Sequence, residues 1–206
     1  MNKPTLTYFD IPTSRGEECR LALFIANVPF IDERLNREQW ELRKSSAPFG
    51  ALPVFTSEGH PPLAQSNAIL RLLGSQHGLL PADAWESARH ESVMCSVEEM
   101  RAKLGPTLRI KDAVEKQKAR EALATGYFPE WSAQLEKQIT GPFLGGAALS
   151  VADLKLFVAL TPLLAGKIDH VPPETFKPFP KLIALVDAVK KHARVVEWYA
   201  QPSTSR

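Results

Sequence analysis

The chain has 206 residues, of which 44% are hydrophobic and 23% charged, enough for a sizeable core in one or two globular domains. Its formal net charge of +2, with no cluster of Lys and Arg, argues against the basic stripe of proteins that bind nucleic acid or anionic lipid. Cys19 and Cys95 lie far apart with no CxxC or metal-ligand spacing, which argues against a disulfide framework, a zinc site and a dithiol redox motif.

No segment of the sequence predicts membrane insertion or export. The longest apolar run, residues 156–166, is too short to span a bilayer, and residues 1–10 lack an apolar signal core. Two cysteines without the spacing of a disulfide framework fit a reducing compartment. We therefore expect a protein of the cytoplasm that does not associate with membranes and whose partner is a small molecule.

The first 78 residues alternate between strand-like and helix-like segments. Strand patterns cover residues 4–9, 30–34 and 53–56 and a short run that ends at Ala64, while helical patterns cover 17–26, 38–45 and a stretch from Ser66 to near Gly78. A Glu58-Gly59 turn separates the last two strands, which indicates a hairpin. The predicted order is βαβαββα.

Beyond residues 78–83 the strand patterns stop and helical periodicity continues to the C-terminus. Apolar side chains recur at the spacing of buried helix stripes: Leu123, Tyr127, Trp131, Leu135 and Ile139, and then Leu182, Leu185, Val186 and Val189. The chain therefore divides into an α/β domain at residues 1–78 and an all-α domain at 84–206.

One local motif predicts where a core helix begins. Ser150 and Asp153 fit an N-capping box, and Leu149 and Leu154 fit the hydrophobic staple that often accompanies one. Leu154 and the apolar residues after it continue at helical spacing. We expect the most buried helix of the second domain to start here, and we assign the motif a structural role.

In this order and spacing, six motifs resemble a cytosolic glutathione transferase over essentially the whole chain. They are LTYFD, SRGEECRLAL, REQWELRK, PFGALPVF, AQSNAIL and SVAD. The tyrosine-type classes sigma, mu and pi are the most similar, and YFD and PFG favour sigma. The resemblance implies a thioredoxin-like βαβαββα domain followed by an all-helical domain. It also implies an enzyme of detoxification that joins glutathione, its co-substrate, to small hydrophobic electrophiles without a metal.

The resemblance implies that Pro53 follows a cis peptide bond, so that the main chain of Leu52 can pair with the cysteinyl part of glutathione like an added strand. Ser66, at a helix start, suits the γ-glutamyl carboxylate, with Gln65 beside it. Ser66 could also be only a helix cap, and both roles can hold together.

Trp40 and Lys44, four residues apart, could present an indole N–H and an ammonium group to the glycyl carboxylate. The alternative is an exposed surface pair in which the tryptophan ring stacks on the aliphatic stem of the lysine. Related proteins often have glutamine where this chain has Ala51, so one side-chain hydrogen bond to glutathione is missing.

The resemblance assigns thiol activation to Tyr8, whose hydroxyl would donate to the sulfur, while Arg15 adds positive potential. Ser14 is a rival, because some classes use a serine or cysteine after the first strand. Cys19 is less suited, because it lies inside a predicted helix without a local proton acceptor.

Related proteins are homodimers in which an acid from the neighbouring subunit reaches the γ-glutamyl ammonium group, and Glu98 or Glu99 falls at that place. A solvated helix face is the competing interpretation. Phe49 could insert into the partner subunit or belong to a local core.

The electrophile pocket would lie against the first long helix of the second domain. Its candidate residues are Ile11, Arg101, Leu104 and Leu108. Two other functions stay open: glutathione-dependent isomerisation, in which the thiolate is released unchanged, and a binding or structural protein without catalysis.

Overall fold

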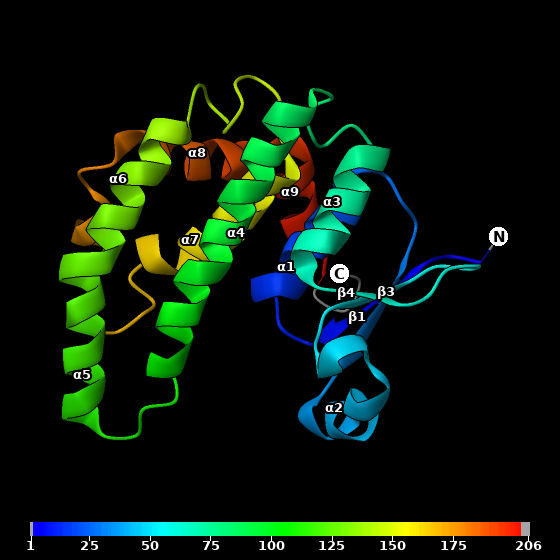
Figure 1. Ribbon diagram of the computed structural model, residues 1–206, viewed down its shortest axis with the longest axis horizontal. Helices are drawn as coiled ribbons and strands as arrows, with labels where there is room; N and C mark the ends of the chain where they lie inside the picture. Colours follow the sequence, from blue (N-terminus) through cyan, green and yellow to red (C-terminus); the bar gives the residue numbers. More distant parts are fainter. Residues whose placement is uncertain (1, 203–206) are drawn as a thin grey trace. The chain divides into compact units, whose positions relative to one another are not determined.

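A computed structural model describes residues 2–202 and divides them into two compact units. The first unit comprises residues 2–83 and 191–202, and the second comprises residues 84–190 (Figure 1). The predicted division placed everything from residue 84 onward in the helical domain, whereas residues 191–202 belong to the first unit by their contacts. No helix within residues 2–202 is long and apolar enough to cross a membrane.

The first unit confirms the predicted order βαβαββα and adds a C-terminal helix. Its elements are β1 (Thr5–Phe9), α1 (Ser14–Ile25), β2 (Ile31–Leu35), α2 (Arg37–Arg43), 3₁₀ turns at Lys44–Ser46 and Pro48–Gly50, β3 (Val54–Thr56), β4 (Leu63–Ala64), α3 (Ser66–Gln76) and α9 (Ala193–Ala200). The main difference is at α1, which begins three residues before the predicted start at residue 17.

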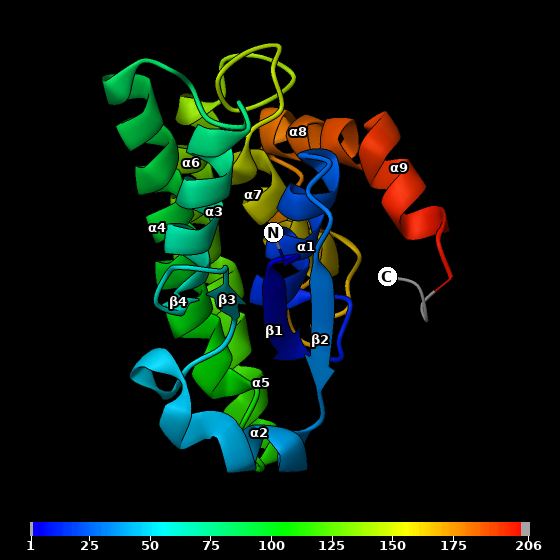
Figure 2. The same cartoon turned by 90° about the vertical axis from the view of Figure 1, so that its right-hand side faces the viewer.

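The four strands form one mixed sheet in the order β2-β1-β3-β4, which Figure 2 shows from right to left. β1 is parallel to β2 and antiparallel to β3, and β3 and β4 form the predicted hairpin. Leu6 and Tyr8 are buried and alternate with half-buried neighbours on β1, so one face of the strand enters the core. α1 and α3 pack against each other and contact β1 and β4 respectively.

The second unit is helical, as predicted. Its elements are α4 (Ala84–Thr107), α5 (Ala113–Ala122), a π-helical segment at Leu123–Tyr127, α6 (Phe128–Gln138), α7 (Val151–Leu164), a 3₁₀ turn at Pro173–Phe176 and α8 (Pro180–Lys191). The predicted stripe on α8 is buried, because Leu182, Leu185, Val186 and Val189 are each less than a tenth exposed.

The predicted capping box is present at the start of α7. The Ser150 hydroxyl accepts a hydrogen bond from the Asp153 backbone N–H, and the Asp153 carboxylate accepts one from the Ser150 backbone N–H. α7 is buried on every side from Val151 to Leu160, which confirms it as a core helix.

The predicted stripe from Leu123 to Ile139 is only partly right. Trp131, Leu135 and Ile139 are buried, but Leu123 and Tyr127 are half-buried. Ala124 and Phe128 occupy the core instead. The π-helical segment explains the difference, because its wider turns displace the buried face from the one that regular α-helical spacing predicts.

Candidate functional site

Tyr8 lies near the carboxyl end of β1 with its ring enclosed by its own unit. The residue is 5% exposed, and its ring meets the Phe9 ring edge-on with centroids 5.6 Å apart. The first turn of α1 closes another side, since a Cβ atom on Gly16 would lie 2.0 Å from Tyr8 Cδ1. Only glycine allows this approach. The predicted thiol-activating residue is therefore held beside the amino end of α1, where the helix dipole is positive.

The same helix turn carries both residues weighed beside Tyr8. Ser14 is the first residue of α1 and has φ of 65°, a backbone region that residues with side chains rarely occupy. Arg15 follows it and is half-buried. Cys19 is completely buried inside α1, which removes it as a nucleophile that a ligand could reach.

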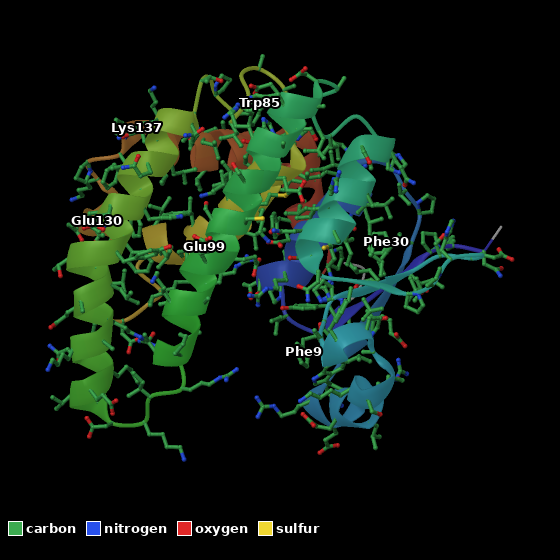
Figure 3. All side chains as sticks on the ribbon, viewed as in Figure 1. Phe9, Phe30, Trp85, Glu99, Glu130 and Lys137 are labelled. Atoms are coloured by element: carbon green, nitrogen blue, oxygen red, sulfur yellow. The ribbon has the colours of Figure 1, made fainter. Side chains whose placement is uncertain are left out.

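Trp40 and Lys44 lie at the carboxyl end of α2 and just beyond it. Trp40 is 8% exposed and Lys44 is exposed, so the interpretation of the two as an exposed surface pair is wrong. The indole packs edge-on against Phe9, with ring centroids 6.2 Å apart, and Figure 3 labels Phe9. Phe9 thus touches both Tyr8 and Trp40. The sequence analysis missed this residue, because strand alternation places the Phe9 side chain on the opposite face of β1 from that of Tyr8.

The segment before β3 has an irregular backbone. Phe49 has φ of 57° in the 3₁₀ turn Pro48–Gly50 and is 84% exposed, so a role in a local core is wrong. The peptide bond between Leu52 and Pro53 is cis, as predicted. β3 begins at Val54, directly after it.

Gln65 and Ser66 lie at the start of α3, and the N-cap is one residue earlier than the Ser66 cap that the sequence suggested. Gln65 is the N-cap, with φ of 74° and ψ of 114°, and its side chain makes no cap hydrogen bond. Ser66 is the first helical residue and is 3% exposed. Its hydroxyl and backbone N–H lie in the first turn, where helix N–H groups lack intrahelical partners.

On α4, Glu98 and Glu99 differ in their surroundings. Glu98 Oε1 accepts hydrogen bonds from Lys155 Nζ at 2.5 Å and from Arg101 Nη1 at 2.9 Å. Glu99 is exposed on the same helix (Figure 3). Because Glu98 is already hydrogen-bonded within its own unit, Glu99 is the better placed of the two to meet a partner.

Glu99 also acts on Tyr127, at the end of the π-helical segment. Burial and, after it, the charge of Glu99 raise the pKa of the Tyr127 phenol. Lys103 Nζ lies 5.0 Å from the centroid of the same ring. Nothing in the sequence pattern indicated this group, because it depends on the π-helical turn.

The candidate electrophile residues come from both units and stay a prediction as a set. Ile11 is 38% exposed in the first unit, and its carbonyl oxygen accepts from Arg20. In the second unit, Arg101 pairs with Glu98, Leu104 is half-buried, and Leu108 lies beyond the end of α4. Within residues 2–202, no three His, Cys, Asp or Glu side chains are grouped so as to hold a metal ion.

Known protein families account for both parts of the chain. The glutathione S-transferase N-terminal domain matches residues 4–75, and the glutathione S-transferase C-terminal domain matches residues 98–202. Glutathione S-transferase 1 of Ascaris suum is 32% identical, with 95% of each chain covered. The chain belongs to the glutathione S-transferase family, which confirms the predicted family and fold.

Solved structures agree. The crystal structure of the glutathione S-transferase from Ascaris lumbricoides has a TM-score of 0.84 at 29% identity and covers 98% of this chain and 100% of its own. The structure of prostaglandin synthase D of Nilaparvata lugens has a TM-score of 0.84 at 27% identity and covers 98% and 99%.

Proposed function

We propose that this chain is a glutathione transferase of the tyrosine type, closest to the sigma class, that joins the thiolate of glutathione to electrophilic small molecules. The position of Tyr8 carries the proposal. Its ring is fixed between Phe9 and Gly16 at the amino end of α1, where a phenolic hydroxyl can meet a thiol in positive potential.

The charges of glutathione match the groups on the first unit. The tripeptide has two carboxylates and one ammonium group, so its site needs an anion receptor at each end. Ser66 and the first turn of α3 would bind the γ-glutamyl carboxylate, with Gln65 beside it. Lys44 and Trp40 would bind the glycyl carboxylate, and Leu52 before Pro53 would pair with the cysteinyl main chain.

Tyr8 would act by favouring the thiolate. A free thiol has a pKa of about 8.5, so only a few per cent of it is ionised at neutral pH. A hydrogen bond from the tyrosine hydroxyl to the sulfur lowers that pKa, at about 1.4 kcal/mol for each tenfold gain in thiolate. The proton passes to water, the sulfur forms a bond to the electrophilic carbon, and the leaving group departs with the bonding electrons. Arg15 adds positive potential in the same turn.

The proposal includes a homodimer in the cytoplasm. Glu99 would pair with the γ-glutamyl ammonium group bound to the partner subunit, and Phe49, which is 84% exposed, would insert into that subunit. Ile11, Arg101, Leu104 and Leu108 would contact the hydrophobic electrophile.

A second candidate is glutathione-dependent isomerisation. The likeness to prostaglandin synthase D of Nilaparvata lugens supports it. In that reaction the thiolate attacks the substrate and is later expelled, so glutathione is not consumed.

The test is a conjugation assay over a panel of electrophiles, with glutathione consumption followed beside product formation. Conjugates with equal loss of glutathione support the transferase. Product without loss of glutathione supports the isomerase. No turnover, together with no retention on immobilised glutathione, contradicts both and favours a structural protein.

A further inference from the structure

A completely buried arginine lies beside the strand end that carries Tyr8. Arg20 Nε is 3.0 Å from both carboxylate oxygens of Asp32. Its Nη1 donates to the carbonyl of Ile11 at 2.9 Å, and its Nη2 donates to that of Phe9 at 3.1 Å. The guanidinium carbon is 5.8 Å from the Tyr8 ring centroid. Arg20 therefore fixes the backbone that follows Tyr8.

Glu17 connects this arginine to the C-terminal helix. Glu17 is 2% exposed, and its Oε2 lies 3.5 Å from Arg20 Nη1. Its other oxygen accepts a hydrogen bond of 2.7 Å from Trp198 Nε1. A buried carboxylate is held in place only if donors satisfy its oxygens. Glu17 also follows Gly16, the residue that touches the Tyr8 ring, so a shift of its backbone would move that contact.

α9 brings Trp198 to this place by a defined attachment to α1. Arg194 Nη2 donates to the Phe24 carbonyl at 2.8 Å and to Asn27 Oδ1 at 2.7 Å. The Arg194 guanidinium lies 4.1 Å from the Phe24 ring centroid, and the Trp198 ring lies 5.2 Å from it. The indole N–H is thus directed by packing and hydrogen bonds on the same helix.

From these contacts we infer that Trp198 is a positioning residue for thiol activation. Its N–H orients Glu17, Glu17 orients Arg20, and Arg20 holds the Phe9 and Ile11 carbonyls next to Tyr8. The C-terminal helix thereby sets the geometry of the Tyr8 hydroxyl through its contacts with α1. The inference rests on the proposed function of Tyr8.

Trp198→Phe tests it, because phenylalanine keeps a ring against Phe24 and removes only the donor to Glu17. We expect the pKa of the bound glutathione thiol, read from the ultraviolet absorbance of the thiolate, to rise by about half to one pH unit. Turnover at neutral pH should fall about 3- to 10-fold, with little change in the KM for glutathione. If Trp198→Phe does not fold, Glu17→Gln is measured in its place, with the same direction expected.

Val195→Ala is the matched control, because Val195 is buried on α9 but its side chain has no group that could donate a hydrogen bond to Glu17. It should lower the free energy of unfolding and leave the thiol pKa unchanged. If the wild-type enzyme conjugates glutathione but Trp198→Phe has the same thiol pKa as the wild type, the inference is overturned. It is also overturned if Val195→Ala raises the thiol pKa as much as Trp198→Phe does. Absence of conjugation and binding in the wild-type enzyme instead overturns the proposed function.

Discussion

The two units differ in how many residues with unusual backbone geometry they contain. Four of the five non-glycine residues with positive φ in the described chain lie in the first unit, among them Ser14, Phe49 and Gln65. The cis bond before Pro53 lies there too. Ser14 and Gln65 begin helices, and the cis bond precedes β3. The first unit therefore has its irregular backbone at two helix starts and before a strand.

Both units bury polar side chains, and those of the second unit lie inside its helix packing. His90, Asp153 and Lys155 are each 1% exposed or less, and each is hydrogen-bonded to a residue of the same unit. Burying such groups costs stability unless they are paired. The comparison predicts that changes at the candidate site residues of the first unit affect binding and catalysis, whereas changes to the buried polar groups of the second unit affect folding.

The largest effect is expected for Tyr8→Phe. The ring and its packing remain while the hydroxyl is lost, so turnover at neutral pH should fall about 10- to 1,000-fold with little change in folding or glutathione affinity. The loss should shrink as pH rises, because above the free thiol pKa glutathione ionises without help. A pH series of kcat/KM measures both effects.

Ser14→Ala is the control for Tyr8→Phe, since Ser14 lies in the same turn. This substitution should leave turnover in the same assay nearly unchanged. An active Tyr8→Phe beside an inactive Ser14→Ala would assign the chain to the serine-type classes and leave the glutathione contacts in place.

How far the sequence predicted these units depends on how local each signal is. The order βαβαββα and the Ser150 capping box were predicted because turn residues and caps act within a few residues. The grouping of residues 191–202 with the first unit was missed. Val195 and Trp198 make an ordinary amphipathic pattern, and such a pattern does not say which partner it packs against.

In the candidate site, too, contacts between distant segments were not predicted. Tyr8, Pro53 and Ser66 were named as candidate site residues from short motifs and stay predictions. The burial of Trp40 against Phe9 was not predicted, because that contact joins α2 to β1. Ser66 was expected as a possible cap, yet the cap is Gln65 with φ of 74°, a backbone choice that a propensity argument does not favour. The Glu17–Trp198 bond spans 181 residues, and no spacing rule predicts it.

A large effect on folding is expected for Asp153→Ala in the second unit. Its carboxylate accepts from the Leu144 N–H at 2.7 Å, the Ser150 N–H at 2.8 Å and the Ser150 hydroxyl at 2.6 Å. Removing the acceptor leaves buried donors unpaired, so the free energy of unfolding should fall by about 3 kcal/mol. Chemical denaturation measures it.

The comparison also requires that Asp153→Ala keep normal turnover per folded molecule. Glu174→Ala, which breaks an exposed ion pair with Lys177, is the control and should leave unfolding unchanged. A stable Asp153→Ala, or a catalytic loss without a stability loss, would contradict the structural role of the box.

Ser66→Ala should weaken glutathione binding about 5- to 100-fold, because a charged ligand group loses a hydrogen bond in a partly buried site. Calorimetric titration gives the dissociation constant. Ser75→Ala is the control on the same helix, since Ser75 is exposed and its hydroxyl donates to the Leu72 carbonyl. An unchanged dissociation constant in Ser66→Ala would reduce Ser66 to a structural residue of the first turn.

The smallest effect concerns His90, which connects α4 to the capping box. Its Nδ1 lies 3.1 Å from Ser150 Oγ, and its Nε2 is buried without a hydrogen-bond partner among the described residues. Burial, and next the charge of Arg89, lower the pKa of His90, while Glu86 opposes them. The folded protein therefore keeps His90 neutral at pH values where the unfolded chain, with a histidine pKa of about 6.5, takes up a proton.

His90 should accordingly make the second unit sensitive to mild acid. Below about pH 6.5 the unfolded state binds one more proton than the folded state, so stability falls as pH falls towards the lowered pKa, by at most about 1.4 kcal/mol per pH unit. Burial raises the pKa of nearby Asp153, which acts in the opposite sense, with stability falling as pH rises above the usual Asp value. His90→Gln removes only the histidine contribution. Urea unfolding at pH 7, 6 and 5 should show a smaller loss of stability on acidification in His90→Gln than in the wild type, and equal losses would mean that His90 is protonated in the folded protein as readily as in the unfolded chain.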